Sequence, residues 1–313
     1  MNFLKKRAAS TVALVATAAV ALTGCSRGEG EPEPAANSAE MRVASLGLGD
    51  ADTLLALGIT PVAVAPWGAE GDIGPSGVGP WSEHLLGDAD PVAIYNTASG
   101  FTADILEQVS AADPTHIVAV NQAVDVEAQE SLENIAPTTL APEEFDDWQV
   151  PWEDQVTAIA EGVGKESEGQ ELIKQTQQVF DDFRRDHPEV QGSRAAIVMP
   201  YDGKIGLYTA EDGRGQFIED LGFDIPDELQ GDGSTFFVDY APENYTELNN
   251  VDYLFVLDYN GLVDQIKDDP TFKNLDVVRD GRVHYLDTDT GSAMSMPNPV
   301  TIPWVAERFE EQL

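Results

Sequence analysis

The sequence contains a single cysteine, Cys25, among its 313 residues. No disulfide bond can therefore form within the chain, and the folded part has to be stabilised by hydrophobic cores. Basic residues are also few, because 17 Lys and Arg stand against 56 Asp and Glu and give a formal net charge of −39. Proteins that bind DNA or RNA carry basic patches, so this composition excludes a nucleic-acid partner.

Histidine is scarce as well, with four residues in the whole chain. His116 begins a predicted strand, His187 ends a predicted helix and His284 lies within another strand, so these side chains and His84 do not converge as zinc ligands do. The sequence also lacks the Gly-x-Ser-x-Gly, Gly-x-x-x-x-Gly-Lys and His-Glu-x-x-His motifs of hydrolases, phosphate-binding enzymes and metalloproteases. We therefore expect neither a bare-metal site nor an enzyme.

The apolar run at the N-terminus, residues 8–22, is too short for a transmembrane helix, which needs about 20 residues. It follows three basic residues and precedes Thr23 and Gly24, an order typical of a secretory signal peptide over residues 1–24. The segment LTGC at 22–25 resembles the bacterial lipobox, in which the cysteine thiol receives a diacylglyceryl group. A chance cysteine after an ordinary signal peptide is the alternative.

Residues 26–40 are rich in Gly, Glu, Pro, Ala, Asn and Ser and show no apolar periodicity, which is typical of a flexible tether. We expect Cys25 to carry the lipid, with acyl chains such as palmitate, and residues 25–40 to tether a domain that begins near Met41. The protein would then be exported and anchored to the outer face of the plasma membrane.

Short apolar strands alternate with helices through the rest of the chain, a pattern that predicts an α/β fold with parallel sheets. The first set comprises strands over residues 42–46, 61–65, 116–120 and 138–140 and helices over 50–57, 103–109, 126–135 and 153–163. The second set comprises strands over 195–199, 205–209, 253–257 and 282–286 and helices over 215–221, 262–266 and 302–313.

Between the two sets, residues 166–187 predict one long helix, because their apolar residues fall on a single helical face. The predicted fold class is α/β, with two Rossmann-like lobes that have mostly parallel sheets. The lobes span residues 41–164 and 189–313, and a connector helix within 165–188 bridges them. Two lobes also suit the roughly 270 residues after the tether, which exceed the usual size of a single core.

Several phrases along the chain resemble the iron-siderophore substrate-binding lipoproteins of ABC importers, of the ferric-citrate and ferrichrome type. They occur in the family's order and cover residues 42–313, with Val109 in place of Ile and Thr115 in place of Asp as departures. The matching phrases are RVASLG at 42–47, DTLLALG at 52–58, PVAVAPW at 61–67, EQVSAADPTHI at 107–117, LENIAPT at 132–138, FIEDLGF at 217–223 and VRDGRVHYL at 278–286.

The resemblance implies that the protein captures a ferric siderophore in a cleft between the lobes and delivers it to an ABC permease and its ATPase. The siderophore, and not the protein, would coordinate the iron, and no cofactor beyond the lipid is expected. In the family one glutamate of each lobe docks on the permease, and the corresponding residues here are Glu107 and Glu243. We expect a monomer. A haem-binding lipoprotein of the same fold is the alternative, followed by a bare-metal or cobalamin binder.

Ligands of open α/β sheets bind beyond the carboxyl ends of strands, and this rule selects candidate residues in the first lobe. Trp67 follows a predicted strand and Trp81 lies in the loop after it, where their rings either contact a siderophore or pack only on the lobe surface. Asn121 and Gln122 follow the strand over 116–120, and their amides either bind a ligand carbonyl or cap the next helix.

The second lobe offers aromatic and basic candidates at the same kind of position. Tyr201 and Tyr208 flank the predicted strand over 205–209. Arg214 opens the following helix and provides a planar set of donors for a ligand, unless a neighbouring acidic residue pairs with it.

The last candidates lie nearer the C-terminus. Tyr259 follows the strand over 253–257, and a predicted loop over 291–298 precedes the final helix. In this loop Met294 and Met296 could form an adaptable apolar wall beside Asn298, unless the loop is only a flexible link.

Overall fold

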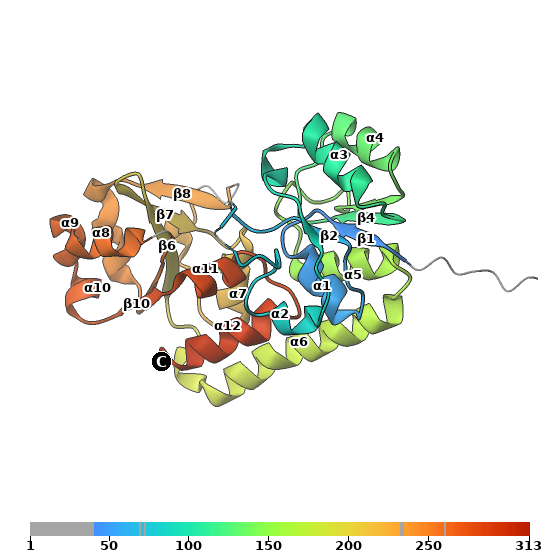
Figure 1. The fold of residues 1–313 in the computed structure, drawn as a ribbon. Helices are drawn as coiled ribbons and strands as arrows, with labels where there is room; N and C mark the ends of the chain where they lie inside the picture. The colour runs from blue at the N-terminus through green and yellow to red at the C-terminus, as the bar shows by residue number, and fades with distance from the viewer. Residues whose placement is uncertain (1–40, 69, 72, 232–234, 260) are drawn as a thin grey trace, which may run out of the picture. The chain divides into compact units, whose positions relative to one another are not determined.

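A computed structural model describes residues 41–313 except 69, 72, 232–234 and 260. Cys25, the predicted signal peptide and the tether lie outside the described residues. The described part contains two five-stranded sheets, one before and one after a long helix, α6 (Glu166–Asp186) (Figure 1). We call the parts before and after α6 the first and the second lobe. The predicted α/β class is thereby confirmed.

Within the described residues, no helix is both long and apolar enough to cross a bilayer.

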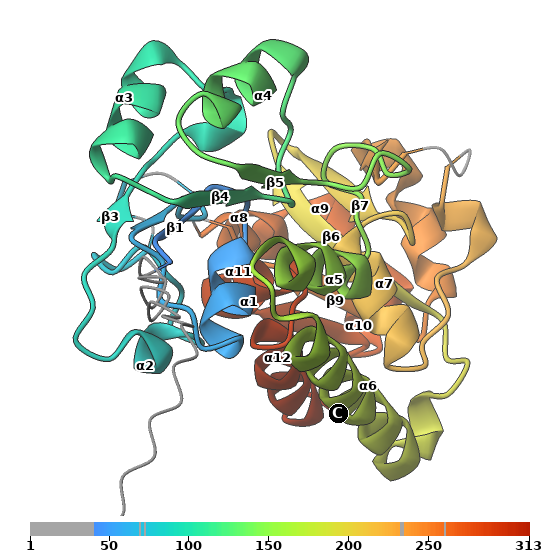
Figure 2. The same ribbon diagram turned by 90° about the vertical axis from the view of Figure 1, so that its right-hand side faces the viewer.

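The first lobe is built on a parallel sheet with the order β3-β2-β1-β4-β5. The alternate residues of its central strands β1 and β4 enter two different hydrophobic cores, since both faces of the sheet are covered. Helices α3 and α4 cover one face, and α1 and α5 cover the other (Figures 1 and 2). The elements are β1 (Val43–Ser45), α1 (Asp50–Ala56), β2 (Ala63–Val64), α2 (Glu83–Leu86), β3 (Val92–Ala93), α3 (Ala103–Ala111), β4 (His116–Ala119), α4 (Val126–Glu133), β5 (Thr138–Leu140) and α5 (Trp152–Gly162).

The second lobe has a mixed sheet with the order β10-β9-β6-β7-β8. Strands β10, β9 and β6 run parallel, whereas β7 pairs antiparallel with both β6 and β8. Its elements are β6 (Ala195–Tyr201), β7 (Lys204–Tyr208), α7 (Gly213–Asp220), β8 (Phe237–Tyr240), a 3-10 segment (Pro242–Asn250), β9 (Tyr253–Leu257), α8 (Leu262–Asp268), α9 (Pro270–Lys273), α10 (Asp276–Arg279), β10 (Val283–Leu286), α11 (Thr288–Met294) and α12 (Thr301–Glu310).

Helix α6 fulfils the prediction of a long amphipathic connector. Its buried Phe180 and Phe183 enter the core that also contains Phe217 of α7 and Phe309 of α12. Acidic residues in its first turn and Arg184 and Arg185 in its last turn suit the direction of the helix dipole. The apolar stripe of α6 thus packs against the second lobe, and the helix also contacts α5 of the first lobe, where the ring centroids of Phe180 and Trp152 lie 6.4 Å apart.

The region before the last helix differs from the prediction of a loop over 291–298. Residues 288–294 form α11, because the Asp287 side chain accepts a hydrogen bond from the Thr290 amide at 2.7 Å and caps the helix. Gly291 of this helix faces Leu257 at the end of β9, and α11 also packs against α12. The polar run TDTGSA carries no apolar periodicity, so sequence patterning alone gives no sign of the helix.

Two buried aspartates connect the start of α1 with distant parts of the chain. Asp50 accepts hydrogen bonds from the Val120 amide at 2.7 Å and the Asn121 amide at 3.2 Å. Asp52 accepts from Trp81 Nε1 at 2.8 Å and from Asn298 Nδ2 at 3.2 Å. Since Asn298 directly precedes α12, the Asp52 carboxylate joins the first lobe to the C-terminal segment.

The buried Asp50 should make stability depend on pH. Burial raises the pKa of its carboxyl from 3.8 to about 7, although amide hydrogen bonds partly oppose this shift. Between about pH 4 and pH 7 the folded chain thus holds a proton that the unfolded chain has released, so stability falls as pH rises through this window. The loss is at most roughly 1.4 kcal/mol per pH unit. Asp50→Asn should remove this component, which urea unfolding at several pH values would measure; equal slopes in both proteins would contradict it.

Candidate ligand-binding site

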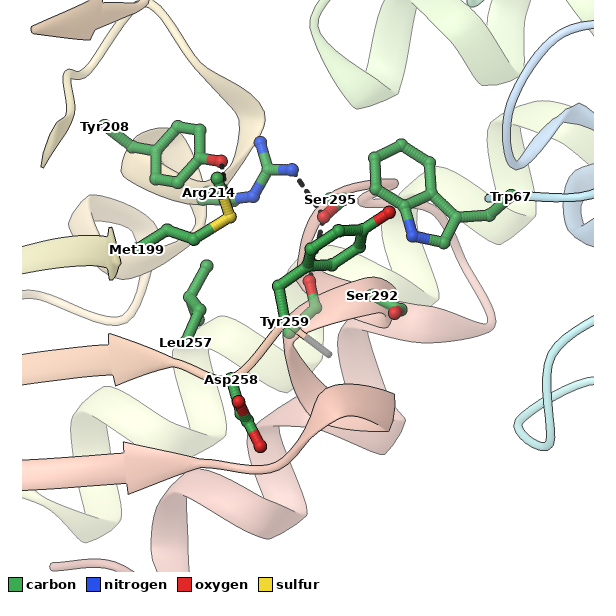
Figure 3. Close-up of a pocket in the computed structure, with 10 residues that line it drawn as sticks. Trp67, Met199, Tyr208, Arg214, Leu257, Asp258, Tyr259, Ser292 and Ser295 are labelled. Atoms are coloured by element: carbon green, nitrogen blue, oxygen red, sulfur yellow. Dashed lines mark hydrogen bonds between the residues drawn. The ribbon is translucent and has the colours of Figure 1, made fainter. Parts of the chain in front are cut away.

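A cavity of ≈ 230 Å³ lies between a loop of the first lobe and the carboxyl ends of second-lobe strands. Trp67, which follows β2, approaches it from the side opposite Met199, Tyr208 and Arg214 (Figure 3). The position agrees with the rule that parallel sheets bind ligands beyond the carboxyl ends of their strands. The lining residues are Trp67, Met199, Tyr208, Arg214, Leu257, Asp258, Tyr259, Gly291, Ser292 and Ser295.

Arg214 lines this cavity but is only 8% exposed. Contacts on several sides fix its guanidinium. Its Nη1 donates to both carboxylate oxygens of Asp212 at 2.9 Å, and its Nη2 donates to Ser295 Oγ. The guanidinium carbon lies 4.1 Å from the centre of the Tyr208 ring, a cation–π contact. Its buried Nε has no hydrogen-bond acceptor among the described residues. That nitrogen has almost no exposed surface, so a ligand in the cavity meets Arg214 only at the part of the side chain that stays exposed, 10% of it.

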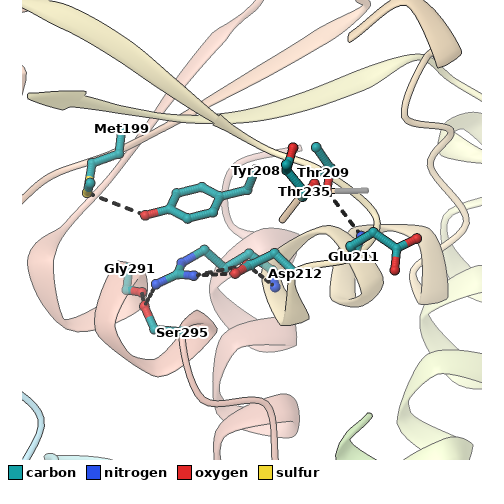
Figure 4. Close-up of polar contacts among 9 residues, drawn as sticks. Met199, Tyr208, Thr209, Glu211, Asp212, Thr235, Gly291 and Ser295 are labelled. Atoms are coloured by element: carbon teal, nitrogen blue, oxygen red, sulfur yellow. Dashed lines mark hydrogen bonds and ion pairs between the residues drawn. The ribbon is translucent and has the colours of Figure 1, made fainter. Parts of the chain in front are cut away.

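The local fold explains why Arg214 is so rigid. Asp212 is the N-cap of α7, and its Oδ1 accepts from the Arg214 amide at 2.8 Å as well as from the guanidinium. The Ser295 hydroxyl donates in turn to the Gly291 carbonyl of α11 at 2.8 Å (Figure 4). The prediction left open whether an acidic neighbour pairs with Arg214. Asp212 does so, and Arg214 still lines the cavity.

Tyr208 stands beside Arg214 and is mostly buried. Burial raises the pKa of its phenol, so the hydroxyl stays protonated at neutral pH. This hydroxyl donates to the sulfur of Met199 at 3.6 Å, which orients the ring along the cavity wall (Figure 4).

A second cavity of ≈ 100 Å³ adjoins the first, since Trp67, Tyr259 and Ser292 line both. Its remaining wall is built from the loop after β2 and the start of α11. The other lining residues are Ile73, Gly74, Pro80, Trp81, Thr288 and Asp289. Trp67 and Tyr259 are thus placed at the junction of a continuous hollow.

Four predicted residues line the first cavity: Trp67, Tyr208, Arg214 and Tyr259. Trp81 borders the second cavity but is only 3% exposed. Its indole nitrogen bonds Asp52, and its ring packs edge-on against Trp304 with ring centroids 5.6 Å apart. Trp81 therefore mainly joins the first lobe to α12.

Asn121 and Gln122 are turned inward and serve the fold of the first lobe. Asn121 Nδ2 donates to the Leu48 carbonyl at 2.9 Å, and Gln122 Nε2 donates to the Leu46 carbonyl at 3.0 Å. Neither caps α4, because the cap is Asp125. Neither lines the two cavities that Trp67 joins.

Three further predicted residues lie away from the first cavity. Met294 is 1% exposed and belongs to the hydrophobic core. Asn298 is buried and accepts hydrogen bonds from the Val300 and Thr301 amides at the start of α12. Tyr201 borders a separate hollow at the β6–β7 turn, where its hydroxyl donates to Asp239. The prediction of Met294 as a cavity wall places this residue in a loop. Residues 288–294 instead form α11, and this helix directs the Met294 side chain into the core.

Met199 and Leu257 line the first cavity although the sequence did not single them out. Both are apolar residues within strands, which is also the pattern of ordinary core positions. Met199 faces the cavity because it lies on the same sheet face as Ile197, whose register partner on β7 is Tyr208. The local sequence does not show how β6 pairs with β7, so it gives no sign that Met199 lies at the cavity.

The predicted docking residues Glu107 and Glu243 lie in different lobes. Glu107 is exposed on α3, and Glu243 is exposed in the 3-10 segment after β8. Neither takes part in a salt bridge within the part of the chain that the structure describes. Among these same residues, no three His, Cys, Asp or Glu side chains stand close enough together to hold a metal ion.

Comparison with known proteins places the chain among binding proteins. The Fe(3+)-citrate-binding protein YfmC of Bacillus subtilis is 26% identical over 260 residues, which cover 80% of this chain and 74% of the relative. The probable siderophore-binding lipoprotein YfiY of the same organism is 26% identical over 251 residues, covering 75% and 71%. The crystal structure of Streptococcus pneumoniae TIGR4 PiaA in complex with ferrichrome is 26% identical and covers 87% of this chain and 91% of that one, with a TM-score of 0.72. A family model described as periplasmic binding protein matches residues 43–290, so this chain belongs to that family.

Proposed function

We propose that the protein captures a ferric siderophore in the cavity lined by Trp67 and Arg214 and delivers it to an ABC importer. The observation that carries the proposal is the convergence of Trp67 from the first lobe with Tyr208, Arg214 and Tyr259 from the second on one hollow. Aromatic faces and a few fixed polar groups are what a site for a small organic ligand requires. The names of the similar proteins, which include ferric citrate, siderophore and ferrichrome binders, support the same class of ligand.

The chemistry of the cavity favours iron that arrives already coordinated. Burial raises the pKa of the Tyr208 phenol, and its hydroxyl already donates to the Met199 sulfur at 3.6 Å. The described residues that line the cavity include neither His nor Cys, and Asp258 among them accepts a hydrogen bond from the Val263 amide at 3.2 Å. The siderophore would supply the oxygen ligands of Fe³⁺, while the protein would hold the outside of the complex.

Delivery to an importer requires the protein to stay near the membrane, and we attribute this to Cys25. Lipidation of this thiol, followed by the polar tether over residues 26–40, would hold the two-lobed domain at the outer face of the plasma membrane. Mass spectrometry of the N-terminal peptide from membrane-extracted protein tests the anchor, because a diacylglyceryl group and an N-terminus at Cys25 are both required.

Titration of the purified protein with ferric siderophores should quench its tryptophan fluorescence, because Trp67 lies at the junction of both cavities. We expect saturation at micromolar concentration or below for at least one ferric complex. Trp67→Ala should weaken binding about 30-fold, or by about 2 kcal/mol, as is usual for a central aromatic contact.

The matched control is Trp304→Ala. Trp304 packs against Trp81 and Arg308 but lines neither cavity, so its loss should lower stability without changing the affinity for the ligand. A protein that ignores every ferric complex and instead binds haem, seen as a Soret band, would contradict the proposed function.

A further inference from the structure

The first lobe contributes no positive charge to the site. Residues 43–164 contain no Lys or Arg at all, although Asp and Glu recur along the whole segment. Arg42 lies just before them and is occupied at the start of the sheet, where its guanidinium donates to the Ala112 and Asp113 carbonyls. Any cation that faces a ligand must therefore come from the second lobe.

The second lobe provides one guanidinium, and a neighbouring carboxylate balances its positive charge. Of the residues that the structure describes, Arg214 is the only Lys or Arg that lines the two adjoining cavities. Asp212 faces it with both oxygens at 2.9 Å, and each of these two side chains is 10% exposed. Charges interact more strongly in such a buried setting than in water, so little of the Arg214 charge reaches the ligand.

Two more carboxylates border the hollow. Asp258 lines the first cavity and Asp289 lines the second, and neither forms a salt bridge within the described residues. By formal charge, the walls of the two cavities carry the neutral Asp212–Arg214 pair and the two negative charges of Asp258 and Asp289. The whole chain, with a net charge of −39, adds to this field. A ligand with several negative charges would be repelled at every stage of its approach.

Hydrogen bonding and apolar contact remain available to a ligand without net charge. The exposed part of the Arg214 side chain lines the first cavity, and Ser292 borders both cavities. Trp67, Leu257 and Met199 add apolar surface. These groups suit amide oxygens and iron-bound hydroxamate oxygens on aliphatic arms, because such oxygens accept hydrogen bonds while Fe³⁺ cancels the hydroxamate charges.

Ferric siderophores differ in net charge according to their iron-binding groups. Three hydroxamates carry one negative charge each and cancel the charge of Fe³⁺, whereas three catecholates carry two each and leave an excess of three. Citrate complexes are anionic as well. Resting on the proposed function, we infer that the ligand is a neutral or cationic ferric trihydroxamate, and that the Asp212–Arg214 pair together with Asp258 and Asp289 excludes anionic ferric complexes.

The inference is tested by fluorescence titration of the full-length protein in detergent with four complexes. Ferrichrome is a neutral trihydroxamate and ferrioxamine B a cationic one, while ferric enterobactin is a tris-catecholate and ferric citrate a carboxylate complex. We expect a trihydroxamate to bind at least about tenfold more tightly than either anion, with the gap widening at low ionic strength. Tightest binding of ferric enterobactin or ferric citrate overturns the inference but leaves the proposed function intact. A lack of binding by all four overturns both.

Two pairs of variants test the electrostatic cause. Asp212→Asn keeps an acceptor for the cap of α7 but frees the Arg214 charge, so the preference for ferrichrome over ferric enterobactin should shrink about tenfold. Asp276→Asn, which breaks the exposed pair with Arg279, should leave the preference unchanged. If Asp212→Asn unfolds, Ser292→Lys should shrink the preference and Ser292→Gln of similar size should not. An unchanged preference in folded Asp212→Asn or in Ser292→Lys contradicts the inference.

Discussion

Arg214→Met is expected to weaken binding of the ferric ligand about 100-fold, equivalent to about 2.7 kcal/mol. Its guanidinium lies on the cavity wall and is fixed there by Asp212 and Ser295. A hydrogen bond from a charged donor contributes about 1.5–3 kcal/mol, so the loss of this preorganised group accounts for the expected effect. Methionine retains much of the apolar stem and thus limits the change in packing.

The same substitution should also destabilise the fold, because it leaves the Asp212 carboxylate buried without its cation. Breaking a buried pair in this way costs about 3–5 kcal/mol, whereas replacing both partners is often nearly neutral. The double variant Asp212→Asn with Arg214→Met should therefore recover stability in urea unfolding but not ligand affinity. Arg279→Met, at the exposed pair with Asp276, should change neither quantity by more than about 1 kcal/mol. Recovery of affinity in the double variant would show that Arg214 only supports the fold.

Much of this site follows from strand ends that the sequence marks clearly. Trp67 and Tyr259 come directly after short apolar strands, and the carboxyl-end rule is sufficient to bring them to one hollow. Arg214 is found for a related reason, since Asp212 and two glycines mark the start of α7. These predictions depend only on where strands and helices begin and end, which local patterning shows well.

The remaining site residues depend on pairing and packing, which local patterning does not show. Asn121 follows a strand just as Trp67 does, yet its amide turns inward to the Leu48 carbonyl because the loop after β1 lies against it. Ser292 and Ser295 reach the cavity only because α11 forms, and that helix depends on the Asp287 cap and on packing against β9 and α12. The sequence of a polar segment next to a site therefore does not show whether the segment forms a helix, because these tertiary contacts decide it.

Reversing the charge of both Glu107 and Glu243 should reduce iron-siderophore uptake by cells to the level seen without the protein, while ligand affinity stays unchanged. Both carboxylates are exposed, one in each lobe, and neither lies on the two cavities that Trp67 joins. If they dock on basic residues of the permease, Arg at these positions replaces attraction by repulsion at two places at once. Truncating one partner of a charge pair in an interface already costs about 2–5 kcal/mol, so a double reversal exceeds what a transient complex can tolerate.

The control must carry the same change in charge, because the chain is so acidic that any Glu→Arg substitution alters its long-range field. Glu161 of α5 and Glu310 of α12 are exposed, also lie one in each lobe, and form no salt bridge in the described chain. In the first lobe, α5 covers the opposite face of the sheet from α3 (Figure 2). The double variant Glu161→Arg with Glu310→Arg should thus take up iron normally. Equal losses in both double variants would mean that overall charge, and not docking at Glu107 and Glu243, governs delivery.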